Sequence, residues 1–240
     1  MNKTVEVFLK HLVNELNDRG PAPSAPLINL NKNIDDAIKK NIKDGRKYLD
    51  RKEYKQAIYQ FEDALYYSSI TIEEKREIHY MYGKALLGLE QYEDAIKKFQ
   101  KALDYSYTSD KKKEAYNKKE AYNMLAFSQR KLAGSLLDKS KENYINSLDL
   151  DSNYAPALEY YGELLLQMNQ LTKSEDDKID IFDIYEKLQK NSIQPELGEL
   201  TKALCGWKKN ANEGLNFFFE KQLNSVCTIS NTANSNTDDD

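Results

Sequence analysis

The segment YKQAIYQFEDALYY, residues 54–67, recurs in related form as YEDAIKKFQKALDY at residues 92–105. Six residues keep their type and spacing between the two copies, and their offsets are 0, 3, 4, 7, 10 and 11. Residues at these offsets lie on one face of an α-helix. In the first copy they are Tyr54, Ala57, Ile58, Phe61, Ala64 and Leu65. The two segments are therefore predicted to be two copies of one amphipathic helix.

A glycine lies twelve residues before the first alanine of each copy, Gly45 before Ala57 and Gly83 before Ala95. Each glycine belongs to another amphipathic segment. Small residues on two consecutive helices let the helix axes approach closely, while a large residue beside them fills the remaining space. The pattern predicts a repeated, tightly packed helical hairpin.

This pattern resembles the tetratricopeptide repeat family, whose unit is a helix–turn–helix of 34 residues. The second unit carries the family positions most fully, and they are Tyr82, Gly83, Leu86, Tyr92, Ala95, Phe99 and Ala102. The resemblance implies an all-α, right-handed α-solenoid of about four such units. An N-terminal amphipathic helix and C-terminal capping helices are expected to flank it.

A third unit matches through conservative exchanges. Ser128 stands in place of the glycine, Ser140 and Ser147 replace the two alanines, and Tyr144 replaces the phenylalanine. Each exchange keeps a small residue small or a ring a ring. A helical hairpin with the same packing is expected over residues 121–154.

A fourth unit begins 34 residues after the third and places Gly162 in phase with Ser128. Its second helix departs from the pattern, because acidic residues fall where small and apolar ones belong. We expect a delayed second helix that begins after Ser174 as N-cap and runs through Tyr185 and Leu188.

The expected organisation has five parts. An amphipathic helix at 1–19 is followed by a proline-rich linker at 20–34, and a repeat array spans 35–194. The four units lie near 38–71, 76–109, 121–154 and 155–194. Capping helices at 195–224 and a disordered polar tail at 225–240 complete the chain.

The first of these parts carries an apolar stripe within residues 3–17: Val5, Phe8, Leu9, Leu12, Val13 and Leu16. The opposite face mixes both signs of charge, which favours a protein partner over an anionic membrane. The helix is expected to fold back onto the array or to mediate self-association.

Charge and motifs exclude several classes of function. A net charge of −4 gives no basic surface for nucleic acid. His11 and His79 have no nucleophile or metal-ligand spacing around them, and no phosphate-binding loop is present. We therefore expect a protein that is not an enzyme, with no cofactor and no metal.

The expected location is the cytoplasm. No run of 18 apolar residues predicts a membrane span, and no secretory or organellar signal is recognisable. Cys205 and Cys227 lie 22 residues apart without paired spacing, so reduced, structural thiols are expected.

The sequence KKEAYN occurs twice in succession, at 112–117 and 118–123. Six residues are not a whole number of helical turns, so the two copies must point in different directions. Two interpretations are open: extension of a helix at its N-terminus, which we favour, or a functional protrusion.

In the family, positions 2, 5, 9 and 12 of each unit face a concave groove that holds a peptide or helix. The resemblance implies the following groove residues here: Ile42, Arg46, Tyr80, Lys84, Leu87, Tyr122, Leu125, Gln129, Glu159 and Glu163. The predicted floor is aromatic and aliphatic, which suits a protein or peptide ligand with an apolar component.

The family's site for the carboxylate tails of chaperones needs Lys, Asn and Arg at set positions. In this chain those positions hold Ile42, Arg46, Met81, Tyr122 and Ala126. A shift by one unit gives Tyr80, Lys84, Ala126, Pro156 and Tyr160. Neither register supplies a two-carboxylate clamp, so no such tail is expected to bind. The predicted function is a non-catalytic protein–protein interaction scaffold. Two alternatives stay open: a chaperone or escort for an unfolded or secreted client, and a regulatory subunit of a separate enzyme.

Overall fold

The computed structural model describes residues 25–106, 110–168, 180–191 and 194–210, together with Asn224 and Cys227. Over these residues the regular secondary structure is entirely helical. The helices are α2 (Ala25–Asp50), α3 (Tyr54–Tyr66), α4 (Ile72–Gly88), α5 (Tyr92–Asp104), α6 (Lys111–Leu132), α7 (Leu137–Leu150), α8 (Ala155–Gln167), α9 (Ile181–Lys190) and α10 (Gln194–Asn210). A 3₁₀ turn, η1 (Gly134–Leu136), joins α6 to α7.

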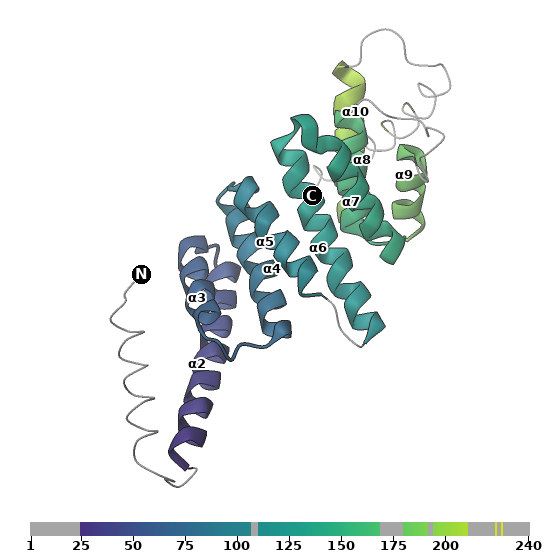
Figure 1. Cartoon of the computed structure of the whole chain (residues 1–240). Helices are drawn as coiled ribbons and strands as arrows, with labels where there is room; N and C mark the ends of the chain where they lie inside the picture. Colours follow the sequence, from purple (N-terminus) through teal and green to yellow (C-terminus); the bar gives the residue numbers. More distant parts are fainter. Residues whose placement is uncertain are drawn as a thin grey trace, which may run out of the picture.

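Consecutive helices form hairpins that stand side by side in chain order (Figure 1). We call α2, α4, α6 and α8 the first helices of the four units, and α3, α5, α7 and α9 the second helices. Each first helix contacts the second helix of its own unit, and α2, α4 and α6 also contact the first helix of the next unit. The chain is thus an all-α solenoid, as the sequence predicts.

The turn inside a unit has the same backbone in the first two units. Lys52 and Glu90 are 38 residues apart and adopt left-handed φ angles of 61° and 58°. After each, a backbone N–H reaches back over the helix end, from Glu53 to the Tyr48 carbonyl and from Gln91 to the Leu86 carbonyl, both at 2.9 Å. A left-handed residue with this hydrogen bond is the Schellman ending of a helix. The first two units therefore share the backbone conformation of this turn as well as the spacing of their side chains.

The predicted close approach of small residues and rings is confirmed. A Cβ atom placed on Gly83 would lie 2.6 Å from Cε1 of Phe99, and one on Gly45 would meet the ring of Phe61. Ala57 and the rings of Phe61 and Phe99 are fully buried. Each glycine is therefore required by the phenylalanine of the facing helix, because a larger residue has no space.

The third unit keeps this architecture with polar atoms in the interface. The hydroxyl of Ser140 donates to the carbonyl of Ala126, and that of Ser147 donates to the carbonyl of Lys119, both at 2.8 Å. Both serines are fully buried. The hydroxyls are satisfied on the facing helix, so the exchange of alanine for serine adds hydrogen bonds between α6 and α7 without leaving an unpaired polar group.

The fourth unit is completed in an unexpected way. α9 is delayed as predicted, but it begins at Ile181 with Asp180 as N-cap, and its capping box uses Asp183; Ser174 lies outside the described residues. The space above Gly162 is filled by Leu200 of α10, 2.6 Å from a Cβ placed on the glycine. α10 therefore occupies, against Gly162, the position that the second helix holds in units one and two.

One expectation about the ends of the chain is wrong. α2 begins at Ala25, so the residues from 25 onward in the expected linker at 20–34 are helical. Pro26 did not prevent this, because proline is tolerated in the first turn of a helix, where its missing N–H would have no partner. The expected helix within 1–19 lies outside the described residues, as does most of the tail at 225–240.

The prediction of two reduced thiols is also wrong. Cys205 of α10 and Cys227 form a disulfide across a separation of 22 residues. Spacing in the sequence could not show this pairing, because the chain must return to α10 for the sulfur atoms to meet. One premise of the cytoplasmic location is therefore lost, since disulfides persist mainly in oxidising compartments.

The duplicated KKEAYN segments lie within one continuous helix, α6, so the duplication extends a helix at its N-terminus, as the favoured interpretation expects. Equivalent residues of the two copies have different surroundings. Glu114 pairs with Lys111 and Lys118 of its own helix, whereas Glu120, its counterpart, faces α4. Six residues advance the helix by 600°, so each copy presents its glutamate in a different direction.

Candidate functional site

Polar contacts join neighbouring first helices at each of the three junctions. Arg46 of α2 pairs with Glu77 of α4. Tyr80 of α4 hydrogen bonds to Glu120 of α6. At the third junction an arginine of α6 pairs with a glutamate of α8. These contacts lie along the side of the array formed by α2, α4, α6 and α8, which we call the first-helix face.

Tyrosines from three elements gather around Glu120 at the centre of this face. Burial, then the negative charge of Glu120, raises the pKa of Tyr80 far above its usual range. The same two causes raise the pKa of Tyr154, at the start of α8, to about 12. A hydrogen bond to Glu120 is the main cause of the raised pKa of Tyr116. All three hydroxyls thus stay protonated at neutral pH, and those of Tyr80 and Tyr116 donate to the carboxylate of Glu120.

The cluster differs in exposure from one side to the other. Tyr80 is half-buried and packs edge-on against Phe99, with their ring centroids 5.9 Å apart. Tyr116 is 57% exposed. A large exposed ring beside a carboxylate is the kind of anchor that protein-binding surfaces use, because it offers contact area at a low entropic cost.

Cations border the same cluster. Lys119 forms an ion pair with Asp151 at 2.6 Å, and its ammonium lies 4.6 Å from the ring centroid of Tyr154 and 5.3 Å from that of Tyr116. Arg76 of α4 is partly buried; burial lowers its pKa, and the negative charge of Glu120 acts against that effect. The surface therefore alternates donors, rings and charges of both signs within a short distance.

The junction between α6 and α8 is the most buried of the polar contacts. The side chain of Arg130, 10% exposed, pairs with Glu163 at 2.6 Å. Its guanidinium lies 5.4 Å from the ring centroid of Phe127 and 5.9 Å from that of Tyr160. An arginine held by one carboxylate and two rings is fixed in direction, so this junction sets how α8 lies against α6.

The groove residues expected from the family resemblance do not share one environment. Arg46 and Lys84 are exposed, and four residues are half-buried: Tyr80, Leu87, Tyr122 and Glu163. Three lie in the interior, namely Ile42, Leu125 and Glu159. Gln129 is buried too and accepts a hydrogen bond from Asn143 of α7 at 2.9 Å, so it faces a second helix.

Sequence reasoning missed Tyr116, Lys119, Glu120 and Tyr154 as members of the cluster. The cause is the start of α6 at Lys111, ten residues before the expected start of the third unit at 121. A signal was available: Tyr116 and Glu120 are four residues apart and therefore share one helical face. The duplicated segment supplies most of the centre of the first-helix face.

Comparison with known proteins supports the fold alone. The crystal structure of MamA, a helical repeat solenoid, matches with a TM-score of 0.50 and 16% sequence identity, over 77% of this chain and 88% of that chain. This likeness supports a tetratricopeptide-type fold. No protein-family model matches the chain. No curated protein matches its sequence either.

The part of the chain that the structure describes holds no group of three or more His, Cys, Asp or Glu residues placed to bind a metal ion. Within that part, none of the helices has the length and apolar character needed to cross a membrane.

Proposed function

We propose that this protein is a non-catalytic scaffold that binds a peptide or helix of a partner protein on its first-helix face, the concave side in the family that it resembles. The cluster around Glu120 carries the proposal. It combines an exposed ring, protonated hydroxyls and a carboxylate, contributed by three separate elements of the array. A ligand lying across α4, α6 and the start of α8 would touch all of them at once.

The ligand is expected to be apolar in part and to carry hydrogen-bonding groups. Tyr116 offers ring area, and Glu120, which accepts from the hydroxyls of Tyr80 and Tyr116, offers a carboxylate with no ion pair among the described residues. Large buried contacts at the centre of an interface dominate its binding energy, and polar groups set the orientation of the ligand. The family's clamp positions hold one basic residue in either register, Arg46 or Lys84, and do not supply the full set that the carboxylate tail of a chaperone requires.

The experiment places a photo-crosslinking amino acid at position 116 of the full chain and, as a control, at Tyr66, which is 64% exposed on the second helix α3. A partner that crosslinks at position 116 and not at position 66 is then purified and its affinity is measured by calorimetry. We expect Tyr116→Ala to weaken binding by about 2 kcal/mol, as at an interface hot spot, and Tyr66→Ala to have little effect.

Glu120→Gln tests the polar part of the site without changing its volume. It is expected to weaken the same partner while the melting temperature is unchanged. If both Tyr116→Ala and Glu120→Gln bind the partner with full affinity, the first-helix face is not the binding site.

A second candidate is favoured by one observation. The disulfide between Cys205 and Cys227 suits an oxidising compartment, where an escort for a secreted client would act. Such an escort would protect an unfolded client from proteolysis on the same face, whereas a scaffold would bind a folded partner or a short motif. Protease protection of a reduced, unfolded model client separates the two.

A further inference from the structure

A second surface feature lies away from the cluster around Glu120, between α3 and α5 of adjacent units. It is a hollow of about 430 Å³, which we call the α3–α5 groove. Its apolar floor consists of Ile58 from α3 with Tyr82 and Leu86 from α4. Polar side chains at the start of α5 and along it form its rim, and they are Gln91, Asp94, Lys97, Lys98 and Lys101.

The rim has more positive than negative charge. Lys97 pairs with Asp94 at 2.7 Å, which leaves Lys98 and Lys101 without an ion pair among the described residues. The ammonium of Lys98 lies 3.8 Å from the ring centroid of Tyr82. This contact holds the cation over the apolar floor instead of in bulk water.

Burial is the main cause of a lowered pKa at Lys98, and the positive charge of Lys101 adds to it. Glu62 and Asp94 act in the opposite direction without cancelling the effect. The protein thus keeps a partly desolvated ammonium beside a second cation. A carboxylate placed between them would stabilise both charges.

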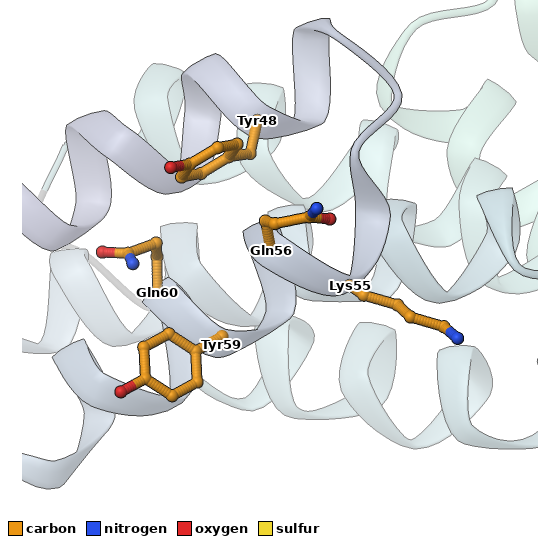
Figure 2. A pocket seen from close by; sticks show the side chains of 5 residues that line it. All are labelled: Tyr48, Lys55, Gln56, Tyr59 and Gln60. Carbon is orange, nitrogen blue, oxygen red and sulfur yellow. The ribbon is translucent and has the colours of Figure 1, made fainter.

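The first unit shows that the fold does not need these lysines. The equivalent hollow, of about 350 Å³, lies between Tyr48 of α2 and the side chains of Tyr59 and Gln60 on α3 (Figure 2). Moving 38 residues along the sequence takes Tyr59, Gln60 and Asp63 to Lys97, Lys98 and Lys101. The positions are therefore free to vary on the surface of a second helix.

The third unit gives the same result. Aligning Ala95 with Ser140 takes the three lysines to Glu142, Asn143 and Asn146. Among the three units with an aligned second helix, the second alone has lysines at these positions. The basic rim is thus a property of one groove and has no general role in packing the repeat.

We propose that the α3–α5 groove is a second docking site, which binds an acidic segment of a partner protein. An apolar side chain of the segment lies on Ile58 and Leu86, and the carboxylate of a neighbouring Asp or Glu lies between Lys98 and Lys101. Charge complementarity selects this ligand, because the floor offers apolar contact and the rim offers two ammonium groups to one anion.

The test uses the full chain and a fluorescein-labelled, C-terminally amidated peptide of alternating leucine and glutamate, with binding followed by anisotropy at low salt. Lys98→Gln and Lys101→Gln are each expected to weaken binding about tenfold, as the loss of one charge-assisted hydrogen bond does. Lys112→Gln on α6, the same charge change at an exposed lysine outside the groove, is the matched control and keeps full affinity.

Lys101→Gln keeps the test valid if Lys98→Gln disturbs folding, because Lys101 is exposed. Equal weakening by Lys112→Gln would overturn the proposal in favour of a general charge effect. Equal binding of a peptide with glutamine in place of glutamate would overturn the role of the lysines. Binding that appears only after Asp238, Asp239 and Asp240 are changed to Asn would assign the groove to the chain's own tail.

Glu120→Gln should leave binding of this peptide unchanged. A result that refutes the proposed binding on the first-helix face can therefore be distinguished from one that refutes the α3–α5 groove.

Discussion

Gly83→Ala tests the packing that defines the repeat. The new Cβ would lie 2.6, 2.8 and 2.9 Å from three atoms of the Phe99 ring, which is fully buried and has no space to move into. Overpacking a filled core costs about 1–3 kcal/mol. Replacing glycine by alanine inside a helix returns about 1 kcal/mol. Because three ring atoms clash at once, we expect an overpacking cost near the upper end of about 1–3 kcal/mol. The free energy of unfolding should therefore fall by a net amount of about 1–2 kcal/mol.

Gly198→Ala on α10 is the matched control. The substitution is the same, but a Cβ at this position meets no atom within 4 Å. Only the higher helix propensity of alanine over glycine remains, so the free energy of unfolding of this variant should rise by about 0.4–1 kcal/mol. The two substitutions therefore predict melting temperatures that move in opposite directions, with a fall of about 4 °C for Gly83→Ala in a chain of this size.

Thermal melts followed by circular dichroism measure both shifts. The double variant Gly83→Ala with Phe99→Leu completes a cycle that isolates the contact, and it should lose less stability than the two single variants added together. If Gly83→Ala raises the melting temperature as Gly198→Ala does, then Gly83 does not face Phe99 and the assigned repeat register fails.

Three further predictions concern other parts of the array. Reduction of the Cys205–Cys227 disulfide should destabilise α10 by about 3 kcal/mol, seen as faster amide exchange; unchanged exchange would show that the bond does not hold α10. The pKa of His79 is lowered from 6.5 to about 4, first by burial and then by three lysines. The unfolded state therefore binds a proton at His79 more tightly than the folded state does. The free energy of unfolding should be constant above about pH 7 and fall by up to about 3 kcal/mol as the pH is lowered to about 4. Below about pH 4 it should fall no further on account of this residue. His79→Gln should remove this slope, and a slope that persists in it would come from other groups. Arg130→Met should cost about 3 kcal/mol in a denaturant melt because Glu163 loses its partner, and Glu163→Met in the same chain should recover part of it; no recovery would show that the two residues act independently.

The helices and their packing followed from the sequence where one periodic face decided the structure. Ala57 and Phe61 recur at helical spacing as Ala95 and Phe99, and each phenylalanine ring fills the space above a glycine. The serines of the third unit also fitted, because a buried hydroxyl can donate to the facing main chain. Such features depend on residues close in sequence or related by the repeat.

Other features depended on the return of distant segments and were missed for that reason. The path of the chain after α9 decides whether Cys205 meets Cys227. It also decides whether Leu200 covers Gly162. The centre of the first-helix face was missed because α6 starts ten residues before the expected start of its unit. Family positions counted from Ser128 could not place Glu120 opposite Tyr80.

The placement of Leu200 above Gly162 has a consequence for the growth of this protein. Arrays of this kind lengthen in evolution when a whole unit is copied and inserted between two others. A copy added directly after α8 would need the surface that α10 already occupies, and it would displace a helix that is bound by a disulfide. A unit inserted upstream of α8 would leave the contact between Leu200 and Gly162 intact, so α10 and its disulfide restrict growth on this side of the array alone.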